Sequence, residues 1–238
     1  MRLADKVVIV TGSTTGIGEA IARKAVAEGA RVVIHGRNQQ RGEEVCESLG
    51  DAAVLHTDDI SDPDAPQRLV ERALAAFGQI DGVVNNAAWV VRSSLETTDA
   101  DFFDRVMRTN VRGPLLLIKA AVEHLKKSRG AIVNVGSINA YQGEPRQFDY
   151  SISKGGLMTM SRNLANVLAT EGVRVTHFNV GWVLSENEYE LKISEGLPKD
   201  WPETRDRQSV PTGKMTQPEE IAAHAVFWLS DESRPISG

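Results

Sequence analysis

Short continuous apolar runs alternate with longer amphipathic stretches along most of the chain. The runs predict strands at residues 6–10, 32–34, 53–55, 82–85, 131–135 and 173–178. The stretches predict a first helix that carries Ile21, Ala22, Ala25 and Val26 and stops at Gly29, and further helices at residues 39–49, 66–77, 101–127, 150–170 and 218–229. Apolar runs between helices are typical of a parallel sheet covered on both faces. Because alternation implies right-handed crossovers, we expect one α/β domain, residues 1–238, with a Rossmann-like doubly wound, mostly parallel sheet of six or seven strands.

Residues 185–215 depart from this alternation. They are polar and contain Pro198, Pro202 and Pro211. Loops of this length in compact domains are usually functional lids or disordered. The stretch follows the sixth predicted strand, at the edge where open parallel sheets bind ligands. We interpret it as a substrate-covering segment with short helices of its own; the alternative is an uninvolved surface insertion.

Composition and charge narrow the function classes. The chain has 238 residues, of which 41% are hydrophobic and 25% charged, with a net charge of -5. These values fit one compact soluble domain and argue against nucleic-acid binding, which usually needs a basic face. The densest basic stretch, residues 105–129, includes acidic residues and is interpreted as a solvated helix face. Because no apolar run approaches a membrane span and no signal peptide precedes the first strand, we expect a cytoplasmic protein without a membrane partner.

Ser137, Tyr150 and Lys154 form the spacing Ser-x12-Tyr-x3-Lys. A tyrosine and a lysine four residues apart on a predicted helix lie on one face. A phenol titrates near 10, and a nearby positive charge lowers that pKa. The serine, near the end of the preceding strand, is suited to hold a substrate oxygen. The three residues predict proton transfer to or from an alcohol, so an electron carrier must bind elsewhere.

Gly12, Gly16 and Gly18 lie between the first predicted strand and the first helix. Glycines permit a tight turn and a close approach of backbone to a pyrophosphate, while the helix offers free N–H groups and the positive end of its dipole. The spacing matches the general dinucleotide pattern only partly. We predict a dinucleotide site here; a purely structural glycine turn is the alternative.

The residues after the second strand bear on the choice between NAD and NADP. An acid there binds the ribose 2'-hydroxyl, whereas arginine suits a 2'-phosphate. The chain reads Gly36-Arg37-Asn38, without an acid. We therefore favour NADP(H) over NAD(H); the alternative is an exposed Arg37 that stacks on adenine or faces water.

In order along the chain, these motifs resemble the classical short-chain dehydrogenase/reductase family, and the likeness spans nearly the whole chain. Thr11-Gly12-x3-Gly16-x-Gly18 looks like its cofactor loop, and Asp59-Ile60 like its adenine-contacting pair. Asn85-Asn86-Ala87-Ala88 resembles its Asn-Asn-Ala-Gly motif, with Ala88 in place of the last glycine. The resemblance implies an enzyme that transfers a hydride between NAD(P)(H) and an alcohol or carbonyl substrate, working as a homotetramer or homodimer.

The resemblance also implies roles for single residues. Tyr150 would be the general acid/base, Lys154 would lower its pKa and hold the nicotinamide ribose, Ser137 would bind the substrate oxygen, and Asn110 would anchor a water in a proton relay. The implied cofactor contacts are Gly12, Ser13, Thr14, Thr15, Gly16, Ile17, Gly18, Arg37, Asp59, Ile60, Asn86, Ala87, Ala88, Tyr150, Lys154, Gly181, Val183 and Ser185. No metal ion is expected.

Two features depart from the family pattern. Val180 stands where the family usually has proline, and the threonine a few residues later is matched only by Ser185. The backbone that holds the nicotinamide is therefore expected to be less rigid. Residues 236–238 resemble the approach to the family's last strand, so the resemblance implies a chain that is either truncated or incompletely observed before that strand.

The substrate is the least determined part of the prediction. Expected contacts are Ser137, Asn139, Gln147, Tyr150 and Trp182, with Trp89 and Arg92 as further candidates. These side chains are polar as well as aromatic, which favours a small polar alcohol or ketone, such as a sugar or polyol, over a steroid. A dinucleotide-binding regulator or scaffold with little turnover is the alternative of a different class.

Overall fold

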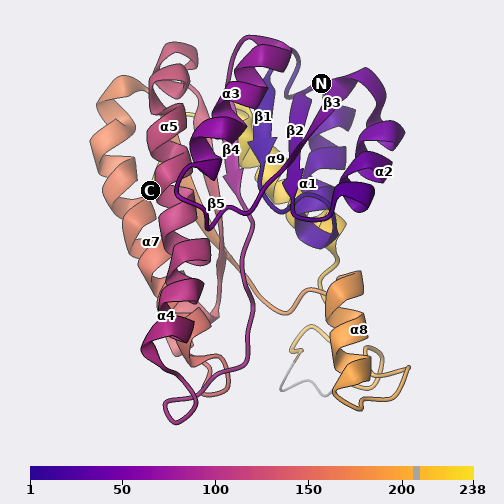
Figure 1. Cartoon of the computed structure of the whole chain (residues 1–238). Helices are drawn as coiled ribbons and strands as arrows, with labels where there is room; N and C mark the ends of the chain where they lie inside the picture. Colours follow the sequence, from indigo (N-terminus) through magenta and orange to yellow (C-terminus); the bar gives the residue numbers. More distant parts are fainter. Residues whose placement is uncertain (206–209) are drawn as a thin grey trace.

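Six parallel strands form a single sheet in the order β3-β2-β1-β4-β5-β6 (Figure 1). The computed structural model describes residues 1–205 and 210–238. The strands are β1 (Val7–Val10), β2 (Arg31–Gly36), β3 (Ala53–Thr57), β4 (Gly82–Asn85), β5 (Ala131–Ser137) and β6 (Arg174–Val180). This arrangement confirms the predicted doubly wound fold. The strand order reverses between β1 and β4, and ligands bind at such a switch point, beyond the carboxyl ends of the strands.

Helices cover both faces of the sheet. One layer contains α1 (Gly16–Ala27), α2 (Gln39–Leu49) and α9 (Pro218–Leu229), and the other contains α3 (Ala65–Phe77), α5 (Gly113–Ser128) and α7 (Phe148–Leu168). Every residue of β1 is at most 1% exposed, because both of its faces are covered. This two-sided burial is why the strands read as continuous apolar runs rather than as alternating ones.

The helix predicted over residues 101–127 forms as a continuous helical stretch, but it contains a π-helical turn that was not predicted. The chain forms α4 (Ala100–Met107), a π-helical turn η2 (Arg108–Arg112) and then α5. Pro114 lies in the first turn of α5 and has no backbone N–H, so regular helical hydrogen bonding cannot continue through it. The wider turn holds Asn110 in the interior, where it is only 1% exposed. π-Helical turns of this kind frequently occur at functional sites.

The carboxyl end of β5 also differs from the prediction. The strand continues through Ser137, which pairs with Val180 of β6. A short helix that was not predicted, α6 (Asn139–Gln142), follows at once. The bounds predicted for α2, β4 and α9 are confirmed. The longer β5 places Ser137 on the sheet itself, at the edge where ligands bind.

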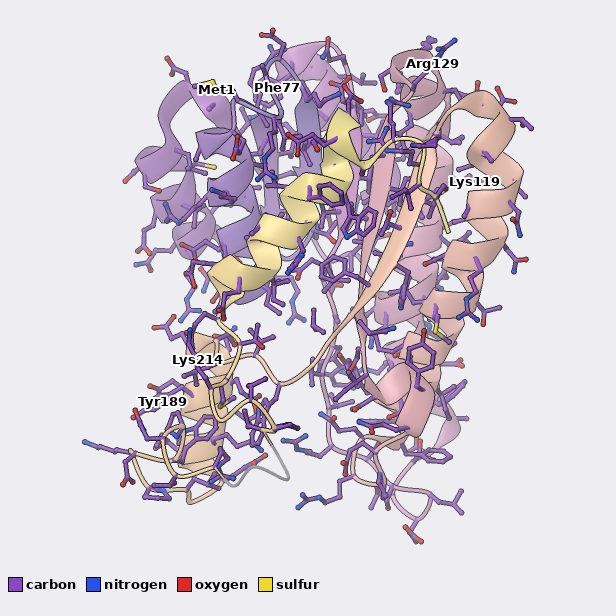
Figure 2. The ribbon with its side chains drawn as sticks, turned by 180° about the vertical axis from the view of Figure 1, so that it is seen from behind. Met1, Phe77, Lys119, Arg129, Tyr189 and Lys214 are labelled. Carbon is purple, nitrogen blue, oxygen red and sulfur yellow. The ribbon has the colours of Figure 1, made fainter. Side chains whose placement is uncertain are left out.

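The stretch after β6 contains α8 (Glu186–Ser194) and an aromatic cluster of its own. Trp201 is fully buried, and its ring stacks on Trp182 and Tyr189 with centroids 5.5 and 6.2 Å away. Figure 2 shows Tyr189 and Lys214 in a projection beyond the carboxyl edge of the sheet. Positions 206–209 of the predicted covering segment lie outside the described residues.

Two further expectations concern the cellular location and the oligomeric state of the protein. Within the described ranges, no helix is both long and apolar enough to cross a membrane. The helices α5 and α7 expose the apolar side chains of Leu115, Ile152 and Val167. A cytoplasmic location and a homotetramer or homodimer stay predictions.

Candidate active site

A cavity of about 1000 Å³ opens at the carboxyl edge of the sheet, beside the ends of β1 and β4. Most of the predicted cofactor residues line it: Gly12, Thr14, Thr15, Gly16, Ile17, Arg37, Asp59, Ile60, Asn86, Ala87, Ala88, Tyr150, Lys154 and Ser185. The fold therefore brings the glycine loop and the tyrosine–lysine pair, which are far apart in the sequence, to one site.

The glycine loop is shaped for a close approach of backbone to a ligand. Gly12 and Gly16 have φ angles of +65° and +59°, which side chains other than glycine rarely adopt. A Cβ atom on Gly18 would lie 2.2 Å from the carbonyl oxygen of Gly12. The Asn86 side-chain amide holds the loop from the other side, donating to the carbonyl oxygens of Thr11 and Gly12 at 2.9 and 3.1 Å.

The first turn of α1 faces this cavity with uncapped N–H groups. Thr15, the N-cap residue, makes no side-chain hydrogen bond to the turn, whereas Asn38 caps α2 and Ser185 caps α8. Gly16 and Ile17, in the uncapped turn, line the cavity. Free N–H groups at the positive end of a helix dipole bind phosphates. Together with the glycine loop, they fit the pyrophosphate of a dinucleotide.

Four predicted cofactor residues are not among those that line the cavity. Ser13 is fully buried; its hydroxyl donates to the Val10 carbonyl at 2.7 Å and accepts from the His35 N–H at 3.0 Å. Gly18 is buried behind the loop. Ser13 and Gly18 thus shape the loop from within. Direct cofactor contacts by these two, and by Gly181 and Val183, stay predictions.

Tyr150 and Lys154 are buried at the inner end of the cavity, on α7. The Lys154 ammonium donates to the Val135 carbonyl oxygen at 2.8 Å and lies 5.6 Å from the centroid of the Tyr150 ring. Burial raises the pKa of Tyr150 to about 12, an effect that a hydrogen bond with Ser137 partly offsets. Burial also lowers the pKa of Lys154 to about 8. The prediction that Lys154 lowers the pKa of Tyr150 below its ordinary value is therefore wrong for this structure. Burial dominates, and the Lys154 ammonium donates to the Val135 carbonyl oxygen rather than to the phenol.

The buried Lys154 predicts a pH-dependent contribution to stability. Its pKa is about 8 in the folded protein and 10.5 ordinarily. Between these values the unfolded chain binds the proton and the folded protein does not, so this group raises the free energy of unfolding as pH increases from 8 to 10.5. Lys154→Met is expected to lack this rise. Denaturant unfolding of both proteins across this range checks it, and a difference independent of pH would contradict the expectation.

Asn110 is buried in η2, and its side chain is fully engaged in hydrogen bonds. Its amide donates to the Ser153 hydroxyl at 3.0 Å and to the Trp89 carbonyl at 3.2 Å. Its oxygen accepts from the Trp89 N–H at 2.7 Å. These bonds tie the loop after β4 to α7. The relay role of Asn110 stays a prediction.

The predicted substrate residues occupy two different places. Asn139 follows Ser137 closely: its backbone N–H donates to the Ser137 hydroxyl at 3.2 Å, and its side chain donates to Gln147 at 2.7 Å. Trp182 packs in the aromatic cluster and donates to Glu188 at 2.7 Å. The structure thus brings Asn139 and Gln147 to Ser137, and Trp182 to the aromatic cluster after β6.

Three arginines that the sequence interpretation left on a solvated helix face line the cavity. These are Arg105, Arg108 and Arg112. Arg105 lies 4.6 Å above the Trp89 ring, and Arg112 donates to the Ser61 carbonyl at 2.5 Å. Their spacing of three and four residues indicated a common helix face. Whether that helix face contacts solvent or a cavity depends on the fold and could not be predicted from the sequence.

Comparisons with known proteins agree with this geometry. A family model described as enoyl-(acyl carrier protein) reductase matches residues 12–238. L-fucose dehydrogenase of Mus musculus is 36% identical over 97% of this chain and 84% of its own. The NADP-dependent (R)-specific alcohol dehydrogenase of Lentilactobacillus kefiri is 35% identical over 100% of this chain and 94% of its own.

A solved structure shares both the fold and the cofactor class. The 3-ketoacyl-(acyl-carrier-protein) reductase of Brucella melitensis, complexed with NADH, matches with a TM-score of 0.87 and 29% identity, covering 99% of this chain and 95% of that one. Motifs, fold and relatives therefore agree: the chain belongs to the short-chain dehydrogenase/reductase family and is an NAD(P)-dependent oxidoreductase that acts on alcohol or carbonyl groups of small molecules.

Proposed function

We propose that the enzyme interconverts a small polar ketone and its alcohol, such as a sugar or polyol, with NADP(H) and with Tyr150 as the acid/base. One observation carries the proposal: Tyr150 and Lys154 line the same cavity as the glycine loop and the uncapped turn of α1. A bound nicotinamide dinucleotide supplies or accepts the hydride. The protein supplies the proton and holds the substrate oxygen.

Tyr150 acts on that oxygen together with Ser137. In the reducing direction, the phenol gives its proton to the carbonyl oxygen while the carbonyl carbon gains the hydride, and an alcohol results. The Ser137 hydroxyl donates a hydrogen bond to the same oxygen. A pKa near 12 keeps Tyr150 protonated at neutral pH, so the proton is present, but its transfer requires that the phenolate be stabilised. The Lys154 ammonium, 5.6 Å from the ring centroid, stabilises the phenolate that remains.

The polar substrate class rests on the groups near Ser137. Asn139 and Gln147 form a hydrogen-bonded pair beside the serine and offer amide groups to hydroxyls. The name of one relative, L-fucose dehydrogenase, supports a sugar-like substrate. A panel of sugars, polyols, acyl thioesters and steroids tests this with NADPH consumption as the readout. Turnover of apolar ketones alone would contradict the polar class.

The NADP preference rests on the end of β2. Gly36 occupies the strand end, and a Cβ atom there would lie 2.6 Å from the Thr14 side chain. Arg37 lines the cavity and is 76% exposed. Asp59 lies 3.8 Å from the guanidinium and would compete with a 2'-phosphate for it. The NADP dependence in the name of the Lentilactobacillus kefiri relative supports the phosphate.

Arg37→Ala is expected to weaken NADPH binding by about tenfold, as for loss of a charge-assisted hydrogen bond, and to leave NADH binding unchanged. Fluorescence titration with each nucleotide measures both constants. Arg23→Ala is the matched control, because Arg23 is an arginine on α1 that pairs with Glu19 at 2.7 Å. Equal losses for the two nucleotides would contradict the 2'-phosphate contact.

A further inference from the structure

A second cavity, of about 520 Å³, lies between the loop after β4 and the carboxyl end of α8. Three cationic side chains line it, those of Arg92, Arg146 and Lys192, together with one carboxylate, that of Glu195. The lining side chains alone carry three positive charges and one negative charge, and two further carboxylates contact them from outside, Glu144 at Arg146 and Glu96 at Ser94. Several cations that converge on one cavity offer partners to an anion.

Glu195 already behaves as an anion bound to two of these cations. One of its carboxylate oxygens lies 3.2 Å from the Arg92 guanidinium, and the other lies 2.6 Å from the Lys192 ammonium. The hydrogen bond from Lys192 holds the pKa of Glu195 below its ordinary value, with Arg92 contributing, so the carboxylate stays charged. Arg92 and Lys192 are thus arranged so that both contact one carboxylate.

Arg146 is the cation with the weakest internal pairing. Its side chain is 89% exposed, and its ion pair with Glu144 is 3.9 Å long. An ion pair of this length at the surface contributes little. The guanidinium is thus available to an incoming carboxylate or phosphate, which it can bind through two parallel hydrogen bonds.

The cavity is joined directly to the catalytic helix. The Ser93 N–H donates to the Arg146 carbonyl at 3.0 Å, and the Ser93 hydroxyl accepts from the Asp149 N–H at 3.2 Å. Arg146 precedes Tyr150 by four residues, so their Cα atoms lie within about 14 Å. The two cavities share no lining residue among the described residues, so a substrate that uses both must extend along this short stretch of chain.

We propose that this cavity binds an anionic group, a carboxylate or a phosphate, on the end of the substrate remote from the reacting carbon. The inference rests on the proposed function and narrows its polar substrate to an acidic one. Arg146 binds the anion directly. Glu195 competes with it for Arg92 and Lys192, so the carboxylate limits the affinity of the subsite.

Matched pairs of probes test the subsite. One pair is 5-oxohexanoate and its neutral methyl ester, and the other is fructose 6-phosphate and fructose. Affinity is measured by tryptophan fluorescence with NADP⁺ present, and turnover with NADPH. At least one anionic probe is expected to bind about tenfold more tightly than its neutral partner, with the advantage shrinking in high salt because the cations are partly exposed. The pair that discriminates identifies carboxylate or phosphate as the preferred group.

Variants of the lining residues are expected to change the affinity for the anionic probe in opposite directions. Arg146→Gln is expected to weaken binding of that anionic probe by about fivefold, Arg146→Lys to restore most of it, and Glu195→Gln to strengthen it. Lys127→Gln, an equal change of charge at an exposed site on α5, is the control and is expected to change nothing. The neutral partner is expected to respond to none of these changes.

The outcomes separate this inference from the proposed function. Equal affinity for both members of both pairs, or equal responses of charged and neutral probes to the variants, would overturn the anion subsite. Turnover of neutral ketones would still uphold the oxidoreductase activity in that case. If no probe is turned over, the proposed substrate class fails, and the binding measurements still decide the subsite.

Discussion

Tyr150→Phe is expected to reduce turnover by about 10² to 10⁴-fold, the usual contribution of a positioned proton donor. Tyr150 is 8% exposed, so phenylalanine fills the same space and removes only the hydroxyl group. The fold and the affinity for NADPH are therefore expected to stay as in the wild type. Steady-state kinetics, thermal unfolding and NADPH fluorescence measure the three properties separately.

Tyr141→Phe is the matched control. Tyr141 lies in α6, near the site in sequence, but its side chain is 67% exposed. Removing that hydroxyl is expected to leave kcat unchanged. Wild-type kcat in the Tyr150→Phe enzyme would show that another group transfers the proton, while a fall in NADPH affinity would assign the Tyr150 hydroxyl to cofactor binding.

Gly18→Ala is expected to lower NADPH affinity, by about tenfold for each 1.4 kcal/mol of binding free energy that the displaced loop loses. The new Cβ atom would lie 2.2 Å from the Gly12 carbonyl oxygen and 2.5 Å from the Asn86 amide nitrogen. Both contacts are with the groups that hold the glycine loop, so the loop must move. Overpacking of this kind also costs about 1–3 kcal/mol of stability.

Gly155→Ala is the matched control for this change. Gly155 lies inside α7, and the nearest atom to a Cβ there is the Ala140 carbonyl oxygen at 3.9 Å, an ordinary contact. Alanine is preferred over glycine in a helix interior by roughly 0.5–1 kcal/mol, so this variant is expected to be slightly more stable. Equilibrium titration and denaturant unfolding compare the two proteins. Wild-type NADPH affinity in Gly18→Ala would show that the loop tolerates displacement.

The layered fold was predictable because its signals are local. The apolar runs of β1 and β4 are continuous since both faces of the sheet are buried. The bounds of α2, β4 and α9 follow from periodicity and neighbouring glycine or proline residues. The π-helical turn η2 was missed because residues 101–127 keep a helical pattern on both sides of it.

The residues that form the site were predictable from the sequence, whereas the pKa shifts of those residues were not. Ser137, Tyr150 and Lys154 have the spacing of a proton-transfer site, and they meet as expected. The direction of the tyrosine pKa shift was not predictable, since it depends on burial and on where the Lys154 ammonium points. Both are properties of packing rather than of spacing.

The sequence by itself determined the fold class, the glycine loop and the candidate residues for proton transfer, because each depends on residue types at short, regular spacings. Only the tertiary structure decided what each surface faces. In the folded protein, the first cavity is lined in part by Arg105, Arg108 and Arg112. Glu195 forms ion pairs with both Arg92 and Lys192. Such contacts join segments up to about a hundred residues apart, so their charges and distances exist only after the chain has folded.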